Sequence, residues 1–413
     1  MLAHFEADRQ IERAIKGERP REVPRLERGF VDPEFVARHI GPVDALNIGG
    51  AACREGAQPR PGPASDVNDA RRPRQVDEER DDDFSGLSRA RGLTLEESRR
   101  VTHSQEYALG KPAVIGAGPV VALGRVERAF VHIVAFEPQY LDLVFAGLSR
   151  QTRRPDHVVL ACDTDRADLG EAAQRWVSRV GAPISWVRRA HHGVARLPQV
   201  RNNSVRHLIG DLGHTRGRLI QIDADIICER AFVEKHLDLG RRAEMVYGYR
   251  VNLTEPESAR LDPELIASGQ HDPPISARQA ASLRRRQMRA RRHLIERALR
   301  LAPPHRPKLL GCNFSAPLEI WRRLNGQDEL FQGWGYSDDE FARRAHLAGA
   351  RCAPAASRII AWHLYHPTRQ PDGPMTSNPN HARFRQRGLP IVAERGLTNP
   401  IEQHPVEVTI FEP

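Results

Sequence analysis

Cysteine is scarce in this chain of 413 residues, and no two cysteines are spaced as a C-x-x-C pair. The five that are present are scattered: Cys53, Cys162, Cys228, Cys312 and Cys352. An odd, dispersed set argues against a disulfide framework and against a structural zinc site. We therefore expect buried or incidental thiols, as in proteins of a reducing compartment.

Long hydrophobic runs are also lacking. No stretch approaches the roughly 18 apolar residues that a membrane-spanning helix needs. The first residues, Met1 to Glu6, do not show the basic and then apolar pattern of a signal peptide. These absences predict a cytoplasmic protein.

Acidic residues are outnumbered by basic ones. With 62 Lys and Arg against 53 Asp and Glu, the chain carries a formal net charge of +9. This excess favours anionic partners such as nucleotides, phospholipid headgroups or nucleic acid, without choosing among them. A hydrophobic fraction of 40% is ordinary for a globular protein, and the length allows a large core.

The N-terminal part is set apart by its composition. Residues 1–50 are an extension to which we assign no role. Residues 51–127 are predicted to be a linker, largely disordered and then transitional. The first part of this linker is rich in Arg, Asp, Glu, Pro and Gly, and it has too few apolar residues to offset the entropy of ordering.

Strands and helices alternate from Phe130 onward. Apolar runs predict strands at 130–136, 157–162, 184–187 and 219–222, and amphipathic runs predict helices at 139–149, 168–180 and 198–210. This order predicts an α/β fold with a mostly parallel central sheet flanked by helices. Ligands bind beyond the carboxyl ends of such strands, where Asp163 and the Asp223-Ala224-Asp225 turn are expected.

The Asp223-Ala224-Asp225 turn is a candidate metal site. Two carboxylates with one residue between them can offer oxygens to a hard cation, whose other positions take phosphate oxygens and water. A cation held there stabilises charge on a diphosphate leaving group. The alternative is a solvated turn, in which Asp is common.

A second acidic motif follows about 110 residues later, in Gly333-Trp334-Gly335-Tyr336-Ser337-Asp338-Asp339-Glu340. The glycines permit a tight turn with an indole wall, which suits a sugar site. Asp338 and Asp339 are expected to open a helix, whose N-terminal dipole keeps a carboxylate ionised and able to accept a proton. Simple helix capping by Asp is the alternative.

A strongly basic helix is predicted at 276–301, with Ser276 as its N-cap. It belongs to an insertion at 252–308 between the two acidic motifs. Three interpretations stay open: a solvated amphipathic helix, a helix that contacts a membrane surface, or a nucleic-acid-binding helix. No other motif supports the last, so we predict no nucleic-acid partner.

The ordered motifs resemble a family 2-type glycosyltransferase of the GT-A fold. The resemblance spans about residues 130–367, within a domain placed at 128–370, and leaves 371–413 as a C-terminal tail. The C-terminal part of this span is similar to the galactosyltransferase and N-acetylgalactosaminyltransferase-like domain. The matching pieces are Gln151 to Pro155, Asp163, Arg201 to Asn203, Asp223 to Asp225, Asn325 to Glu329, Gly333 to Gly335, Asp338 to Glu340, and His363.

The resemblance implies roles for the donor site. Asp163 would contact the nucleoside, expected to be uridine, and Arg201 and Asn202 would lie close to the nucleotide. Asp225 would be the direct metal ligand. Asp223 would contact the ribose or a metal-bound water, and it is counted with both the metal and the donor residues.

The resemblance also implies roles for the second motif. Asp338 would be the catalytic base, and His363 would complete the site of a Mn²⁺ (or Mg²⁺) ion, with His366 as a second-choice ligand. Trp334 and Gly335 would shape the donor and acceptor sugar pocket, and Asp339 is counted with the donor-binding residues. Ser337 departs from the pattern, because the family usually has Glu there to orient the acceptor.

These observations predict a metal-dependent, inverting glycosyltransferase. It would move a hexose or N-acetylhexosamine from a UDP-sugar to a glycan or lipid-linked acceptor. Peripheral membrane contact through the helix at 276–301 remains one of the three open interpretations. One alternative is a catalytically silent carbohydrate-binding scaffold, supported only by Ser337. Another is a sugar-phosphate nucleotidyltransferase, which normally has a Gly-rich phosphate loop that this chain lacks near its first strand.

Overall fold

The computed structural model describes residues 127–270, 272–367, 378–386, 388–402 and 405–413. The expected extension at 1–50 and all but the last residue of the expected linker at 51–127 lie outside the described residues. Everything below concerns the described part of the chain.

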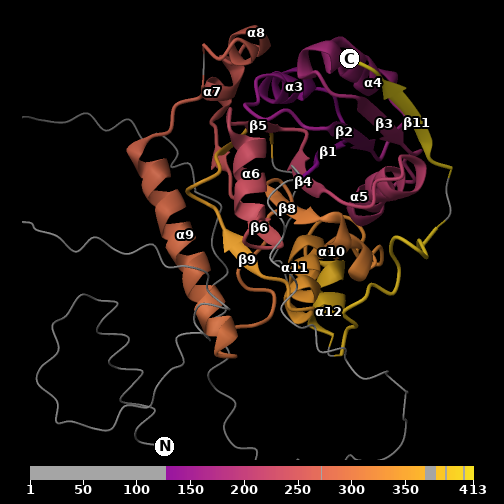
Figure 1. Cartoon of the computed structure of the whole chain (residues 1–413), viewed down its shortest axis with the longest axis vertical. Helices are drawn as coiled ribbons and strands as arrows, with labels where there is room; N and C mark the ends of the chain where they lie inside the picture. The colour runs from indigo at the N-terminus through magenta and orange to yellow at the C-terminus, as the bar shows by residue number, and fades with distance from the viewer. Residues whose placement is uncertain (1–126, 271, 368–377, 387, 403–404) are drawn as a thin grey trace, which may run out of the picture. The chain divides into compact units, whose positions relative to one another are not determined.

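A sheet of eight strands forms the centre of the fold (Figure 1). Its order is β11-β3-β2-β1-β4-β8-β6-β9. The strands are β1 (Ala129–Ala135), β2 (His157–Cys162), β3 (Ile184–Arg188), β4 (Arg218–Asp223), β6 (Met245–Tyr247), β8 (Phe314–Pro317), β9 (Cys352–Pro354) and β11 (Glu407–Phe411). Neighbours from β3 to β4 are parallel, β8 is antiparallel to β4 and β6, and β11 is antiparallel to β3. The predicted α/β fold, with a large central sheet flanked by helices, is confirmed.

Helices cover both faces of this sheet. They are α3 (Leu141–Ser149), α4 (Ala167–Val180), α5 (Leu197–Arg206), α6 (Phe232–Gly240), α10 (Leu318–Arg323) and α11 (Ser337–Leu347). Val131 and Ile133 of β1 pack in the core that contains α3, α4 and α6, whereas Phe130 packs with α10 and α11. Strands buried on both faces are expected to be continuously apolar, which is why the sequence pattern located them.

The expected helix at 198–210 is shorter in the structure. Helix α5 ends at Arg206, and a π-helical turn follows at His207–Asp211. Such a turn is typical of a local insertion in a helix, and propensity patterns do not distinguish it from α-helix.

A second sheet of three short strands lies at the end of β4. It contains β5 (Ile226–Cys228), β7 (Val251–Asn252) and β10 (Ala361–His363) in the order β5-β10-β7. Strand β10 runs antiparallel to β5 and places His363 opposite Ile226. This pairing brings a segment from late in the chain beside Asp225.

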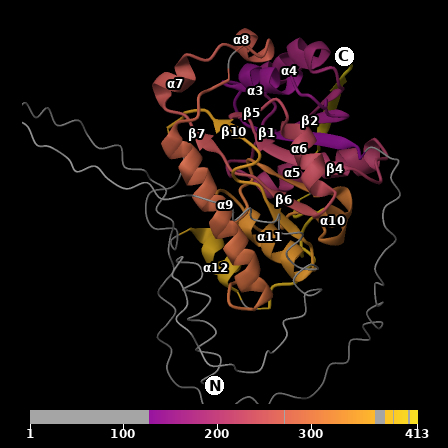
Figure 2. The same ribbon diagram turned by 60° about the vertical axis from the view of Figure 1, so that its left-hand side comes forward.

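The insertion contains α7 (Glu255–Ala259), α8 (Pro263–Ala267) and α9 (Ala277–Ala298). Ser276 is the N-cap of α9, as predicted, and it also forms a capping box with Gln279. Figure 2 shows α9 as a long ribbon along one side of the domain. Among the described residues, no helix has the length and apolarity needed to span a membrane.

The described parts of residues 371–413, the expected C-terminal tail, contain a helix and a strand that contact the domain. Strand β11 extends the large sheet beyond β3, and α12 (Pro379–Arg385) follows the gap after Pro367. Sequence patterns missed this because the tail has no long apolar run, and its burial depends on contacts with distant segments.

Candidate active site

The Asp-x-Asp turn is fixed by backbone hydrogen bonds from both sides. Asp223 ends β4, and the N–H of Ala224 donates to the carbonyl of Val134 at the end of β1 over 3.1 Å. The carbonyl of Asp225 accepts from the N–H of Leu364 over 2.9 Å. The two aspartates are therefore held at the carboxyl ends of the central strands, as predicted.

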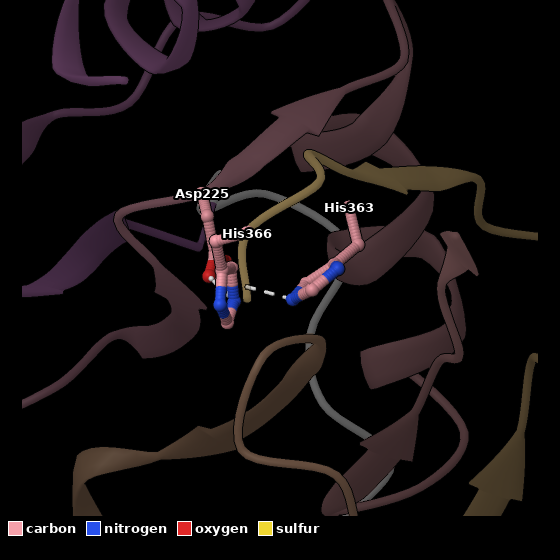
Figure 3. A group of neighbouring side chains, drawn as sticks. All are labelled: Asp225, His363 and His366. Carbon is pink, nitrogen blue, oxygen red and sulfur yellow. Dashed lines mark ion pairs between the residues drawn. The ribbon is translucent and has the colours of Figure 1, made fainter. Parts of the chain in front are cut away.

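Asp225 is the centre of a candidate metal site with two histidines. His366 Nε2 lies 3.1 Å and His363 Nε2 lies 3.4 Å from Asp225 Oδ2. One possible ligand atom from each residue lies within 4.8 Å of the others. Figure 3 shows both imidazole rings directed toward the carboxylate. Asp223 is not part of this cluster, and its role as a metal ligand stays a prediction.

The donor atoms of this cluster suit a divalent cation. Asp225 Oδ1 is buried and has no hydrogen-bond partner among the described residues. His366 Nδ1 lies 3.0 Å from the carbonyl of Pro367. A carbonyl can only accept, so Nδ1 carries a proton, and Nε2, which faces Asp225, would bind a cation in place of its own proton. Two imidazoles and a carboxylate fit a divalent first-row transition metal, and Mn²⁺ as the bound ion stays a prediction.

The pKa values of the two aspartates in the turn are shifted in opposite directions. Burial alone would raise the pKa of Asp225, but hydrogen bonds and charge from His363 and His366 hold it well below its usual range. Burial and the neighbouring Asp225 carboxylate raise the pKa of Asp223. Asp225 is thus the carboxylate of the pair that is ionised and ready to bind a cation.

The predicted base, Asp338, lies in the first turn of α11, whose start confirms the predicted helix. Its Oδ1 accepts a 2.7 Å hydrogen bond from Arg201 Nη1, and its Oδ2 accepts a 3.0 Å bond from the N–H of Gly311. Each carboxylate oxygen keeps a further lone pair. With a side chain 27% exposed, Asp338 can still accept a proton from a bound hydroxyl.

Arg201 joins the two acidic motifs. Its guanidinium is 4% exposed, pairs with Asp338 and lies 3.9 Å from Asp223 Oδ1. The two motifs are far apart in sequence. The buried guanidinium nevertheless contacts Asp338 at the start of α11 and faces Asp223 in the Asp-x-Asp turn. The structure therefore brings together the residues that the resemblance assigns to donor binding and to proton transfer.

The Trp334 turn is clamped by the start of α12. Asn378 Nδ2 donates to the Trp334 carbonyl over 2.6 Å, and Asn380 Nδ2 donates to the Gly335 carbonyl over 3.0 Å. Gly335 has φ 98°, a conformation in which a side chain is strained. The indole of Trp334 is 45% exposed, so it offers an aromatic face to a ligand such as a sugar ring.

Asp339, the neighbour of the base, is partly enclosed. Enclosure raises its pKa to about 6, although Lys308 opposes the shift. Its Oδ1 is buried without a hydrogen-bond partner among the described residues. The assignment of Asp339 to the donor-binding residues stays a prediction.

Two other residues predicted to bind the sugar donor form hydrogen bonds within the protein. Asp163 is 4% exposed, with Oδ1 bonded to Arg189 over 2.7 Å and Oδ2 bonded to the N–H of Arg196 over 3.1 Å. Asn202 is fully buried and bonds to the backbone of Gln327 through both its amide nitrogen and its oxygen. In this conformation Asn202 holds the backbone of Gln327 in place, and its proximity to a nucleotide stays a prediction.

Several contributors were not found from the sequence, or were found only in part. His366 is only a second-choice ligand from the sequence, because H-x-x-H spacing brings two imidazoles together only on a helix or in a turn. Arg189 follows β3 directly, and its place at a strand end was an available signal. Gly311 and Asn380 have no local signature, since each acts through contacts with residues far away in the chain.

Residues 297–367 match the family described as the N-terminal domain of galactosyltransferase. This segment contains Asp338, His363 and His366, and the predicted resemblance to the galactosyltransferase type is confirmed there. A comparison with curated proteins finds no match.

Solved structures with a similar arrangement include a mannosyltransferase and TarS. A mannosyltransferase, PcManGT from Pyrobaculum calidifontis in complex with GDP-Man and Mn²⁺, is 14% identical with a TM-score of 0.38, over 59% of each chain. TarS of S. aureus is 9% identical with a TM-score of 0.38, over 58% of this chain and 37% of that one. A structure of TarS 1–349 is 10% identical with a TM-score of 0.35, over 57% and 60%. In each case less than two thirds of the other chain is spanned.

Proposed function

We propose, from the galactosyltransferase-type segment at residues 297–367, that the protein is a metal-dependent glycosyltransferase. Its donor is a UDP-hexose or a UDP-N-acetylhexosamine, and its acceptor is a hydroxyl of a glycan or of a lipid-linked sugar. The observation that carries the proposal is the position of Arg201, paired with Asp338 at 2.7 Å and 3.9 Å from Asp223. Proton acceptor and donor-binding turn thus share one site.

The chain's own residues supply the proton transfer. The Asp338 carboxylate accepts the proton of the acceptor hydroxyl, and the oxygen of that hydroxyl forms the new bond to the anomeric carbon. The bond from this carbon to the diphosphate breaks, and UDP leaves with the electron pair. Attack from the side opposite to the leaving group inverts the configuration, as in the galactosyltransferase-like branch that the sequence resembles.

Orientation comes from fixed groups around the carboxylate. Arg201 and the N–H of Gly311 each hold one oxygen of Asp338, so its remaining lone pairs have defined directions. The exposed indole of Trp334 provides a wall for a sugar ring. Holding reactants in place in this way lowers the entropic part of the barrier.

A divalent cation bound by Asp225, His363 and His366 would neutralise diphosphate oxygens and favour departure of UDP. Asp225 Oδ1, buried without a partner, is the observation that favours a cation at this turn. Asp223 faces Arg201, and in this proposal it contacts the ribose or a water on the cation.

Calorimetric titration of UDP with and without Mn²⁺, on the wild type and on Asp225→Ala, tests the proposal. We expect binding that requires Mn²⁺ and is lost in the variant. Slow Mn²⁺-dependent hydrolysis of a UDP-sugar without acceptor would then exclude a catalytically silent scaffold. Absence of UDP binding under both conditions would contradict the proposal, and tighter binding of GDP would move the donor to a GDP-sugar.

The proposal includes a lipid surface as a partner, reached through α9. Four apolar side chains on or just after this helix are exposed: Met288 (71%), Ile295 (43%), Leu299 (55%) and Leu301 (73%). Exposed arginines surround them: Arg278, Arg284, Arg285, Arg289, Arg291, Arg292 and Arg300. Apolar side chains among cations match the boundary of an anionic membrane. Contact there would hold a cytoplasmic enzyme at the inner face of a membrane.

A further inference from the structure

The turn that contacts the predicted base is itself held from inside the sheet. Gly311 lies just before β8, and its N–H donates to Asp338 Oδ2 over 3.0 Å. Its carbonyl oxygen accepts a 2.7 Å hydrogen bond from Gln221 Nε2. The two backbone polar groups of one residue therefore connect Asp338 to β4.

Gln221 lies in the middle of the sheet and is fully buried. On β4 it is opposite His132 of β1 and Phe314 of β8. A carbonyl can only accept, so the amide nitrogen of Gln221 must face Gly311. Its Oε1 has no hydrogen-bond partner among the described residues. An unpartnered atom in a buried amide destabilises the fold. We therefore expect the hydrogen bond from Gln221 to Gly311 to serve a function that offsets this cost.

Gly311 packs directly against the ion pair of Arg201 and Asp338. A Cβ atom on this residue would lie 2.5 Å from Arg201 Nη2 and 2.6 Å from Asp338 Oδ2. Gly311 does not have a left-handed φ. Glycine is needed here because a larger residue would be too close to Arg201 and Asp338. A small shift of this turn would therefore displace the carboxylate, the guanidinium or both.

We propose that Gln221 is a positioning residue for proton transfer, acting through Gly311 to hold Asp338 against Arg201. The role of Asp338 as the base rests on the proposed function, whereas the contact chain from Gln221 to Asp338 does not. Two residues beyond Gln221, the same strand ends in Asp223. One strand thus sets both the Asp-x-Asp turn and the turn that holds the base, which fixes their separation.

Three variants of the full chain test this proposal. Gln221→Met keeps the size of the side chain and removes its N–H donor, and Gly311→Ala inserts a methyl group at the pair without touching the sheet. Gln287→Met is the matched control. Gln287 is also buried and also donates to a backbone carbonyl, that of Pro354 over 2.6 Å, but it lies on α9.

The first readout does not depend on turnover. We expect exchange of the Gly311 amide hydrogen, followed by NMR, to become about tenfold faster in Gln221→Met and to stay unchanged in Gln287→Met. The second readout is transfer from a UDP-sugar. We expect kcat to fall about tenfold or more in Gln221→Met and Gly311→Ala, with the donor KM within about twofold.

The pH dependence gives a signature that a general loss of stability does not produce. A carboxylate that loses an N–H donor is less favoured in its charged form, so the acidic limb of the pH–rate profile should move to higher pH. Unchanged exchange in Gln221→Met, or equal effects in Gln287→Met, would overturn the positioning role. If Gln221→Met does not fold, Gly311→Ala takes its place in the test. A wild-type pH–rate profile in Gly311→Ala would then overturn the positioning role. A wild type without any transfer contradicts the proposed function instead, while amide exchange still reports on Gln221.

Discussion

Arg201 Nη1 lies 2.7 Å from Asp338 Oδ1, in a pair that joins α5 to α11. The guanidinium is almost fully buried, and its Nη1 also donates to Gln327 Oε1 over 3.2 Å. A buried guanidinium needs an acceptor of opposite charge, and Asp338 provides it. The pair thus ties the position of Asp338 to that of Arg201, which also faces Asp223.

Asp338→Asn should abolish transfer while UDP binding in the presence of Mn²⁺ stays within a few-fold of the wild type. The amide keeps the shape of the side chain but is not basic, so a loss of about 10²-fold to 10⁴-fold in kcat is expected. Initial rates with a UDP-sugar and calorimetry with UDP measure the two effects separately. Loss of UDP binding in this variant would refute the assignment as a base.

The control for this prediction is Asp168→Asn. Asp168 is also an aspartate in the first turn of a helix, α4, and pairs with Arg166 at 2.7 Å. It lies outside the site, so the variant should keep wild-type kcat. A similar loss in both variants would point to general destabilisation of helix starts.

His366→Ala should weaken Mn²⁺ binding about 10-fold to 100-fold, and His363→Ala should do the same. The reason is geometric, because His366 Nε2 is as close to Asp225 as His363 Nε2 is, and its other ring nitrogen is held by Pro367. Calorimetry with Mn²⁺ alone measures the effect. His381→Ala, in α12, is the control. Wild-type affinity in His366→Ala would leave His363 as the histidine ligand.

The sequence located the central strands and both acidic motifs, because strands buried on both faces are continuously apolar and because Asp225 and Asp338 follow recognisable local patterns. Contacts between distant segments were not predictable in the same way. The place of His366 depends on how the chain turns after β10, and the clamp of Asn380 on Gly335 joins residues 45 positions apart. The partners of Gln221 likewise follow from strand register, which the pattern of one strand does not specify.

His132→Leu should make the protein less sensitive to acid. His132 is fully buried on β1, and neither ring nitrogen has a hydrogen-bond partner among the described residues. Burial and the charge of Arg201 lower the pKa of His132 to about 3. In the unfolded chain the imidazole titrates near pH 6.5, so below that pH the unfolded state takes up a proton that the folded state excludes.

This difference removes stability as the pH falls from about 6.5 toward about 3. Between pH 7.5 and pH 5, His132 should cost about 2 kcal/mol in the free energy of unfolding, which the leucine variant does not lose. Urea denaturation at the two pH values measures this. His192→Ala, at an exposed position, should retain the wild-type pH dependence. If His132→Leu also retains it, another group accounts for the acid sensitivity.

Charge reversal on α9 should weaken binding to anionic membranes. Arg284→Glu combined with Arg285→Glu replaces two exposed cations beside the apolar side chains, and each cation near such a surface contributes about 1 kcal/mol. We expect at least about tenfold weaker binding to phosphatidylcholine vesicles that contain phosphatidylglycerol, measured by co-sedimentation. The wild type should bind little to phosphatidylcholine alone, and added salt should reduce its binding.

The matched control reverses two exposed arginines elsewhere, with Arg322→Glu and Arg323→Glu on α10. It changes the net charge equally and should bind like the wild type if α9 is the surface that contacts lipid. Replacing Met288, Ile295 and Leu299 by serine distinguishes the partner, because a membrane requires the apolar side chains and a nucleic acid requires only the arginines. Full vesicle binding in the serine variant would therefore reject insertion of this helix at the lipid boundary.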